Sequence, residues 1–121
     1  METQVKYTLY CGKLKYDVTN EVFEVLRGVM HWADVEETTL KELNNAIRTG
    51  QDQATIAELE YEVSESRKSL RDYMDKMDEL NVPNWVGNGC IEFGKIKREK
   101  ELYFSDFFTK GKYSKRENIE R

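Results

Sequence analysis

The sequence predicts an α+β fold in which one β-hairpin precedes a group of helices and a second β-hairpin follows them. Three patterns carry this prediction. Apolar and polar residues alternate over the first 19 residues, as they do in half-buried strands. Apolar residues recur with a seven-residue period between residues 53 and 80, which is the spacing of a long packed helix. Short β-prone runs bounded by glycine or charged residues return between residues 84 and 108.

The N-terminal hairpin is predicted from two alternating runs on either side of Gly12-Lys13, which has the form of a two-residue type II′ turn. This turn sets a register in which Cys11 faces Leu14. The other facing pairs are Leu9 with Tyr16 and Tyr7 with Val18. All six side chains then lie on one face of the hairpin, where we expect them to be buried together.

Two short helices are expected next. The first runs from about 21 to 33, and Gly28 within it is a place where another element can approach closely. The second runs from about 40 to 48, because Thr39 and Glu42 have the spacing of a capping box. The polar residues between the two helices are interpreted as a joint.

The long helix is expected from residue 53 to 80, and its apolar residues fill the a and d positions of successive heptads. These residues are Ile56, Leu59, Val63, Leu70, Tyr73, Met77 and Leu80, with Ser66 as the polar exception. Such a stripe is typical of a helix that pairs with a second copy of itself. Homodimerisation is therefore one expectation, and packing against the chain's own hairpins is the alternative.

The C-terminal third is expected to form the second hairpin, with strands at about 90–97 and 102–108. Gly87 and Gly89 flank an asparagine and are interpreted as a turn. Gly94 is interpreted as a β-bulge within the first of these strands.

The whole chain, residues 1–121, is expected to be one domain. Its predicted segments are 1–19 (hairpin), 20–50 (two helices), 52–81 (long helix), 84–108 (C-terminal strands) and 109–121 (basic tail). Its two cysteines lie far apart and form no Cys–His cluster, which favours a reducing compartment. No apolar run approaches the roughly 20 residues of a membrane span. We therefore expect a cytoplasmic protein that makes no membrane contact.

Catalytic and metal chemistry find little support in the sequence. There is no glycine-rich phosphate loop and no GxSxG or HExxH motif, and His31 is the single histidine. Asp72, Asp75 and Asp78 share one edge of the long helix, but basic residues are interleaved with them, as on a solvated surface. We therefore expect neither enzymatic activity nor a metal or other cofactor.

Charge is distributed unevenly along the chain, and this favours binding to another protein. The net charge is −4, yet residues 20–80 carry fifteen acidic and seven basic side chains. Such a segment can attract a basic partner and compete there with nucleic acid. Exposed tryptophan is also a favoured interface anchor. The candidate protein-binding residues are Glu36, Glu37, Glu58, Glu62, Glu65 and Trp85.

The C-terminal third offers an alternative, because it carries nine basic and six acidic residues interleaved with aromatic ones. This mixture is found where single-stranded nucleic acid stacks on rings and its phosphates are neutralised. The candidate residues are Lys95, Lys97, Arg98, Lys100, Tyr103, Lys110, Lys112, Lys115 and Arg116. Direct nucleic-acid binding is less favoured than protein binding because the chain as a whole is acidic.

In its size, acidity and single-domain organisation the chain resembles small proteins encoded by phages and other mobile elements of bacteria. This resemblance covers no particular motif. The acidic middle segment and the absence of catalytic groups lead to the most concrete hypothesis, an inhibitor or regulator that docks on a basic, nucleic-acid-handling host protein, of the anti-CRISPR or anti-defence type, in the host cytoplasm. A coiled-coil structural or oligomerisation protein is a further alternative, because of the heptads.

Overall fold

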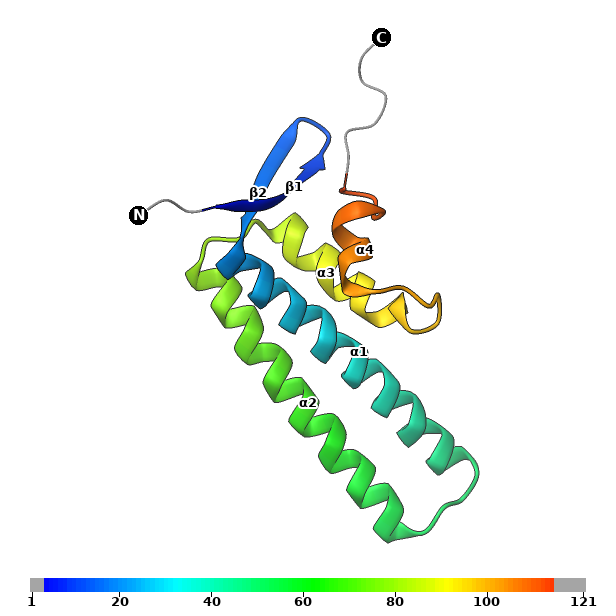
Figure 1. The fold of residues 1–121 in the computed structure, drawn as a ribbon. Coiled ribbons are helices and arrows are strands. Elements are labelled where there is room, and N and C mark those ends of the chain that lie inside the picture. The colour runs from blue at the N-terminus through cyan, green and yellow to red at the C-terminus, as the bar shows by residue number, and fades with distance from the viewer. Residues whose placement is uncertain (1–3, 115–121) are drawn as a thin grey trace.

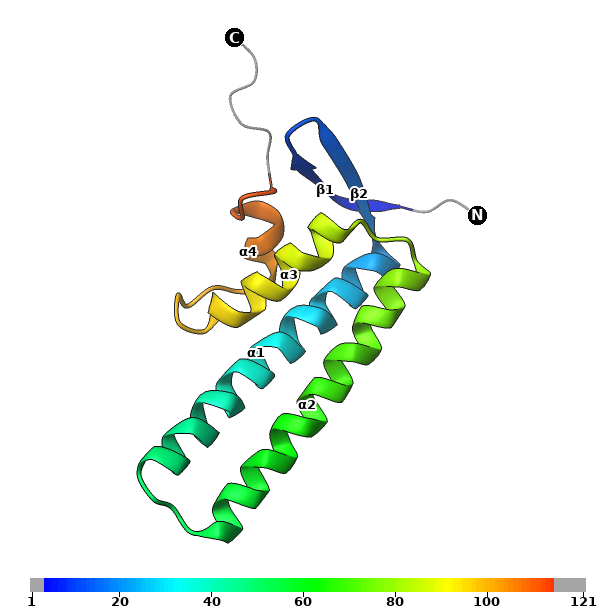
Figure 2. The same ribbon diagram turned by 180° about the vertical axis from the view of Figure 1, so that it is seen from behind.

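The computed structural model describes residues 4–114 and is mostly helical (Figure 1). Its elements are β1 (Val5–Cys11), β2 (Leu14–Thr19), α1 (Asn20–Arg48), α2 (Gln53–Glu79), α3 (Asn84–Lys97) and α4 (Phe104–Thr109). The two long helices α1 and α2 lie side by side and run in opposite directions. The hairpin, α3 and α4 gather around the first half of α1, so the far end of the α1–α2 pair projects from the rest (Figure 2).

The predicted N-terminal hairpin is confirmed, including its register. Cys11 pairs with Leu14, Leu9 with Tyr16 and Tyr7 with Val18. Leu9 and Val18 are completely buried, whereas Leu14, beside the turn, is 55% exposed. Burial is therefore deepest in the middle of the hairpin and does not extend over all six facing side chains.

The prediction of two short helices at 21–33 and 40–48 is wrong, because α1 is one continuous helix. It begins after Thr19, whose hydroxyl accepts a hydrogen bond from the backbone N–H of Val22 at 3.3 Å. The capping box expected at Thr39 does not form, because Thr39 lies inside the helix and donates to the carbonyl of Val35 at 2.8 Å. A threonine that bonds back in this way is compatible with a helix interior.

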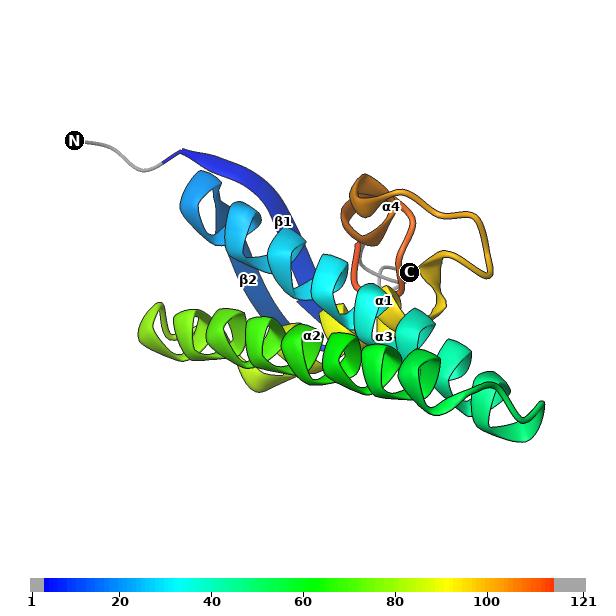
Figure 3. The same cartoon turned by 90° about the horizontal axis from the view of Figure 1, so that it is seen from below.

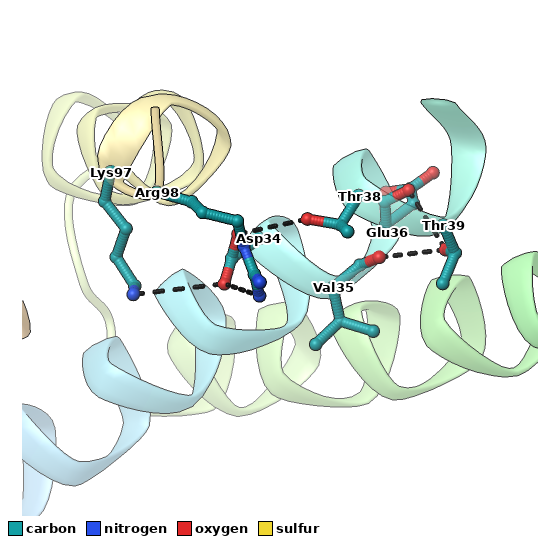
Figure 4. Close-up of polar contacts among 7 residues, drawn as sticks. All are labelled: Asp34, Val35, Glu36, Thr38, Thr39, Lys97 and Arg98. Atoms are coloured by element: carbon teal, nitrogen blue, oxygen red, sulfur yellow. Dashed lines mark hydrogen bonds and ion pairs between the residues drawn. The ribbon is translucent and has the colours of Figure 1, made fainter. Parts of the chain in front are cut away.

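Contacts with α2 also stabilise the polar middle of α1. The carboxylate of Glu36 lies 2.6 Å from the guanidinium of Arg67 on α2. Thr38 donates to the carboxylate of Asp34 at 3.4 Å (Figure 4). Of the residues interpreted as a joint, Glu36 therefore links α1 to α2 and Thr38 bonds within α1, and these contacts override the local signal for a break.

The predicted long helix is confirmed as α2. Asp52 caps it by accepting a hydrogen bond from the N–H of Thr55 at 2.8 Å. Val63, Ser66, Leu70 and Met77 of the heptad stripe are buried, and the stripe packs on α1 of the same chain. Homodimerisation through this stripe stays a prediction, and it would require the stripe to exchange α1 for a second copy.

The predicted C-terminal hairpin is wrong, because the segments 90–97 and 102–108 are mainly helical, in α3 and α4. The supposed turn at Gly87 and Gly89 lies inside α3. Gly94 is not a bulge either, since it is the point where the backbone of α3 touches α1.

Helix α1 forms the centre of the core. Figure 3 shows α1 between α2 on one side and α4 on the other, and α3 packs along it as well. Its buried residues include Leu26, Val29, Met30 and Ala33, all inaccessible to solvent. The first half of α1 is apolar over much of its surface, and this allows several elements to pack on it at once.

The last described residues return to the hairpin. After α4, the backbone N–H of Tyr10 donates to the carbonyl of Tyr113 at 2.8 Å. Most of the predicted basic tail, including Lys115 and Arg116, lies outside the described residues. The part that is described closes over α4 and the edge of β1.

Candidate functional site: the acidic flank of α2

Three of the predicted protein-binding glutamates share one side of α2, and we call Glu58, Glu62 and Glu65 the acidic flank. Residues spaced by three, four and seven positions lie on the same side of an α-helix. All three are exposed. None of them takes part in an ion pair with another described residue. Their charges are therefore available to a partner.

Further carboxylates lie along the second half of α2, beyond the acidic flank. Asp72 and Glu79 follow Glu65 at seven-residue steps, and both are exposed. Asp75 and Asp78 are exposed as well. Within residues 4–114 no group of three or more His, Cys, Asp or Glu side chains is close enough to hold a metal ion. This arrangement produces negative potential over an open surface, which acts on a partner by long-range attraction.

Glu36 and Glu37 do not belong to this surface. They lie on α1, where Glu36 is paired with Arg67 and its side chain is only 17% exposed. Glu37 lies 3.8 Å from Lys41 one turn later. The structure therefore separates these two glutamates from the acidic flank and engages both within the chain.

Trp85, the predicted tryptophan anchor, lies near the start of α3. It is half-buried, and its ring packs against that of Tyr113 with centroids 5.3 Å apart and planes at 63°. This contact stabilises the segment that follows α4. Trp85 is thus placed in α3, apart from the acidic flank on α2.

Two of the predicted nucleic-acid-binding residues instead bind a buried carboxylate. Arg98 forms two hydrogen bonds to Asp34, of 3.1 and 3.0 Å (Figure 4). Lys97 lies 3.9 Å from the same carboxylate, whose side chain is only 7% exposed. The hydrogen bonds and charge of Asp34 raise the pKa of Arg98. This cluster fixes the end of α3 to the middle of α1.

The other basic residues are spread around α3 and α4. Lys110 lies 3.7 Å from Asp106, and Lys112 lies 3.7 Å from Glu92. The pKa of Lys112 is raised, chiefly by its contact with the hydroxyl of Tyr113. In addition, Lys95 and Lys100 are exposed and Tyr103 is 77% exposed. Four of the nine predicted residues are therefore engaged with carboxylates of the chain itself.

Sequence reasoning missed Asp34, which organises the contact between α1 and α3. The available signal was a charged residue directly beside the apolar positions Met30 and Ala33 of a helix. A carboxylate in such a place is rarely buried unless a cation is paired with it. Arg98, 64 residues later, is that cation, and only the fold brings the two together.

An apolar hollow of about 310 Å³ lies between α3, α4 and the segment after α4. Phe93, Phe107 and Leu102 contribute to its wall, and Lys110 and Lys112 stand at its rim. The two lysines already face the carboxylates of Asp106 and Glu92. The rim is thus nearly balanced in charge and selects no ligand by its sign.

Comparison of the chain with protein-family models, with curated proteins and with solved structures found no match. None of the helices in the described part combines the length and the hydropathy that crossing a bilayer requires. Function must therefore be inferred from the surface chemistry described above.

Proposed function

We propose that this protein is a non-enzymatic binding protein that docks the acidic flank of α2 on a basic surface of another protein. The observation that supports it is the set of three exposed carboxylates, Glu58, Glu62 and Glu65, without an ion-pair partner among the described residues. Elsewhere on the chain, several carboxylates are already paired with lysine or arginine. Unpaired like charges on one rigid helix favour a partner of opposite charge.

The position of the acidic flank favours docking. It lies toward the projecting end of the α1–α2 pair, away from the hairpin, α3 and α4 (Figure 1). A surface that projects can enter a groove. The carboxylates are also held on a helix that Asp52 caps and α1 supports, so less conformational entropy is lost on binding than for a flexible segment.

The spacing of the charges favours a partner that handles nucleic acid. At about 1.5 Å rise per residue, the three carboxylates are spread over about 10 Å, or about one charge per 5 Å of helix axis. One strand of DNA carries about one charge per 3.4 Å. The acidic flank therefore offers a nucleic-acid groove a comparable line of negative charge. An inhibitor of the anti-CRISPR or anti-defence type, encoded by a phage or mobile element, would act in this way.

The test is capture of a partner from a bacterial lysate by the tagged protein and by two charge-reversed variants. The first variant is E58K/E62K/E65K. The matched control is D72K/D75K/E79K, which makes the same change of net charge on the same helix, nearer its other end. We expect the wild-type protein and the control to retain one basic, nucleic-acid-handling protein and the first variant to lose it. Duplex DNA should compete for that partner.

Circular dichroism must first show that both variants keep the helical content of the wild-type protein. Capture of the same partner with unchanged affinity by E58K/E62K/E65K would contradict the proposal. So would loss of binding on Lys95→Ala/Lys100→Ala with no effect of the triple variant. That result would favour the basic C-terminal residues and direct nucleic-acid binding instead.

A further inference from the structure

A second surface feature lies between α1, α2 and α4, beyond the acidic flank. It is a hollow of about 330 Å³, which we call the aromatic hollow. Its lining residues are Glu24, Arg27, Gly28, His31, Trp32, Tyr73 and Phe104. Three of the seven are Phe, Trp or Tyr, residues that make up 12% of the whole chain, and His31 adds an imidazole ring.

The three large rings come from three different helices. Trp32 belongs to α1, Tyr73 to α2 and Phe104 to α4, and each is half-buried. Tyr73 approaches α1 closely because Gly28 has no side chain there. His31 adds a fourth ring, edge-on to Trp32 with centroids 4.9 Å apart. Because the three large rings are only half-buried, each keeps part of its surface accessible beside the hollow.

Cations lie over two of these rings, those of Phe104 and Tyr73. The guanidinium carbon of Arg27 lies 5.6 Å from the ring centroid of Phe104, and the ammonium of Lys97 lies 4.7 Å from the same centroid. The ammonium of Lys76 lies 4.7 Å from the ring centroid of Tyr73. The three cations come from α1, α3 and α2, so the fold gathers them on a chain whose net charge is −4.

Two carboxylates lie near these cations, but they neutralise only part of the positive charge. Glu24 lies 3.4 Å from Arg27, but both side chains are more than half exposed, and such a pair is worth little. The carboxylate of Asp34 lies 3.9 Å from the ammonium of Lys97. The same carboxylate accepts two hydrogen bonds from Arg98. No described carboxylate forms an ion pair with Lys76. Arg27, which lines the hollow, can therefore accept an anionic group, and Lys76 lies next to the hollow over the ring of Tyr73.

We propose that the aromatic hollow binds a nucleobase that carries a phosphate. Rings stack on the faces of bases regardless of base identity, and arginine or lysine neutralises the attached phosphate. An apolar ligand would use the rings and not the cations, whereas a small inorganic anion would use the cations and not the rings. The volume lies at the lower end of the range for ligand pockets, which fits one nucleotide unit.

The aromatic hollow shares no residue with the acidic flank. Its lining residue on α2, Tyr73, is two turns from Glu65. Nucleotide binding and protein docking can therefore be tested separately: E58K/E62K/E65K should keep nucleotide binding, and a variant at Arg27 should keep capture of the partner. Failure of one proposal would leave the other intact.

The first experiment uses Trp32 as the reporter. The chain has two tryptophans, so Trp85→Phe leaves Trp32 as the single tryptophan, which is excited selectively over the tyrosines at the red edge of its absorption. The probes are adenosine and cytidine monophosphate, adenosine without phosphate, and inorganic phosphate. We expect saturable quenching by both nucleotides, weaker binding of adenosine, and no quenching by phosphate.

A short single-stranded oligonucleotide is then compared with the free nucleotides. Tighter binding of the strand identifies a base within a strand as the ligand. Equal binding identifies the free nucleotide.

The second experiment tests the residues. Arg27→Ala should weaken nucleotide binding about tenfold, because a hydrogen-bonded contact to a charged group is lost. Arg48→Ala is the matched control, as another exposed arginine of α1, and should bind like the wild-type protein. Phe104→Leu keeps an apolar side chain and removes a stacking surface, so it should also bind more weakly. Absence of saturable quenching by every nucleotide and by the oligonucleotide, or unchanged affinity of both Arg27→Ala and Phe104→Leu, would overturn the proposal.

Discussion

Helices α2 and α3 both pack on α1, but they do so by opposite means. Helix α2 uses large side chains, with Val63, Leu70 and Met77 buried along its heptad stripe. Helix α3 uses the absence of a side chain, because Gly94 brings its backbone against the carbonyl of Met30. The first contact is made by side chains that can adjust, whereas the second is made by main-chain atoms that cannot.

This difference predicts that the two contacts respond unequally to an added methyl group. A β-carbon at Gly94 would meet the backbone of Met30 and lie 2.8 Å from the β-carbon of Ala33. At Gly28 it would meet a side-chain ring of α2, and at Gly87 the flexible end of Met77. Three alanine substitutions and one change of charge therefore probe how rigidly each helix is held.

Gly94→Ala should have the largest effect. Alanine gains about 1 kcal/mol of helix propensity over glycine, but the clash with backbone forces α3 away from α1. We expect the free energy of unfolding to fall by about 2–3 kcal/mol, in the range of overpacked cores. Urea denaturation followed by circular dichroism measures this change. Unaltered or increased stability would show that the α1–α3 contact is not tight.

Arg98→Ala should come next, because it leaves the buried carboxylate of Asp34 with only the weaker contacts to Lys97 and Thr38. Arg98 is itself largely exposed, so solvent reduces the loss to about 1–2 kcal/mol. Arg98→Lys should recover part of it, since lysine keeps the charge and loses the two-point geometry.

The thiol of Cys90 on α3 shows whether Arg98→Ala acts locally. Cys90 is completely buried, and burial raises its pKa, so it should react with a thiol reagent only after α3 opens. We expect faster labelling of Cys90 in Arg98→Ala with little change in Cys11. Equal acceleration at both cysteines would mean that the whole fold opens, and not α3 alone.

Gly28→Ala should have a smaller effect, because the obstacle is the ring of Tyr73 and not a backbone. The ring must turn aside, which costs packing between α1 and α2, while helix propensity offsets about 1 kcal/mol. A net loss of about 1 kcal/mol is expected in urea denaturation. Gly28→Ala combined with Tyr73→Leu should be more stable than the sum of the single changes predicts.

Gly87→Ala should have the smallest effect and the opposite sign. The added β-carbon would lie 3.1 Å from the terminal methyl of Met77, a side chain that adapts easily. Helix propensity then outweighs the contact, and we expect a gain of about 0.5 kcal/mol. A loss comparable to that of Gly94→Ala would contradict the distinction between the two kinds of contact.

The parts of the fold that could be predicted are those whose signals are local. Alternation around Gly12 specified the hairpin and its register, and the heptads of residues 53–80 specified α2. In both segments, the residues that determine the secondary structure are close neighbours in the sequence. Agreement between local propensity and tertiary structure made these predictions correct.

The continuity of α1 and the helices α3 and α4 could not be recognised because the contacts that stabilise them are distant in sequence. Val86, Cys90 and Phe93 do have helical spacing, but the glycines among them have low helix propensity and favoured a turn. Each glycine leaves room for a group that is distant in sequence or lies beyond α3: Gly94 for the backbone of α1, Gly87 for Met77 of α2, and Gly89 for the ring of Tyr113. In α1, the sequence around Glu36 favours a break in the helix. The ion pair of Glu36 with Arg67 of α2, which forms only in the folded chain, favours a continuous helix instead.

The candidate site shows the same division. Exposure of Glu58, Glu62 and Glu65 followed from their positions outside the heptad stripe, as the sequence suggested. The engagement of Glu36 by Arg67 did not follow from any local pattern. The aromatic hollow could not be foreseen either, because its rings come from three helices that only folding brings together.

The hydrogen bond between Tyr10 and Tyr113 has a consequence for the order in which the protein forms during synthesis. The ribosome makes β1 early, yet the carbonyl that completes its edge emerges only after α4. Until then, a nascent chain that contains only β1, β2, α1 and α2 leaves Met30 and Ala33 without the helix α3 that covers them. The segment around Tyr113 therefore closes the edge of β1 only after α3 and α4 have been made, and chains arrested before α3 should be the ones that chaperones retain.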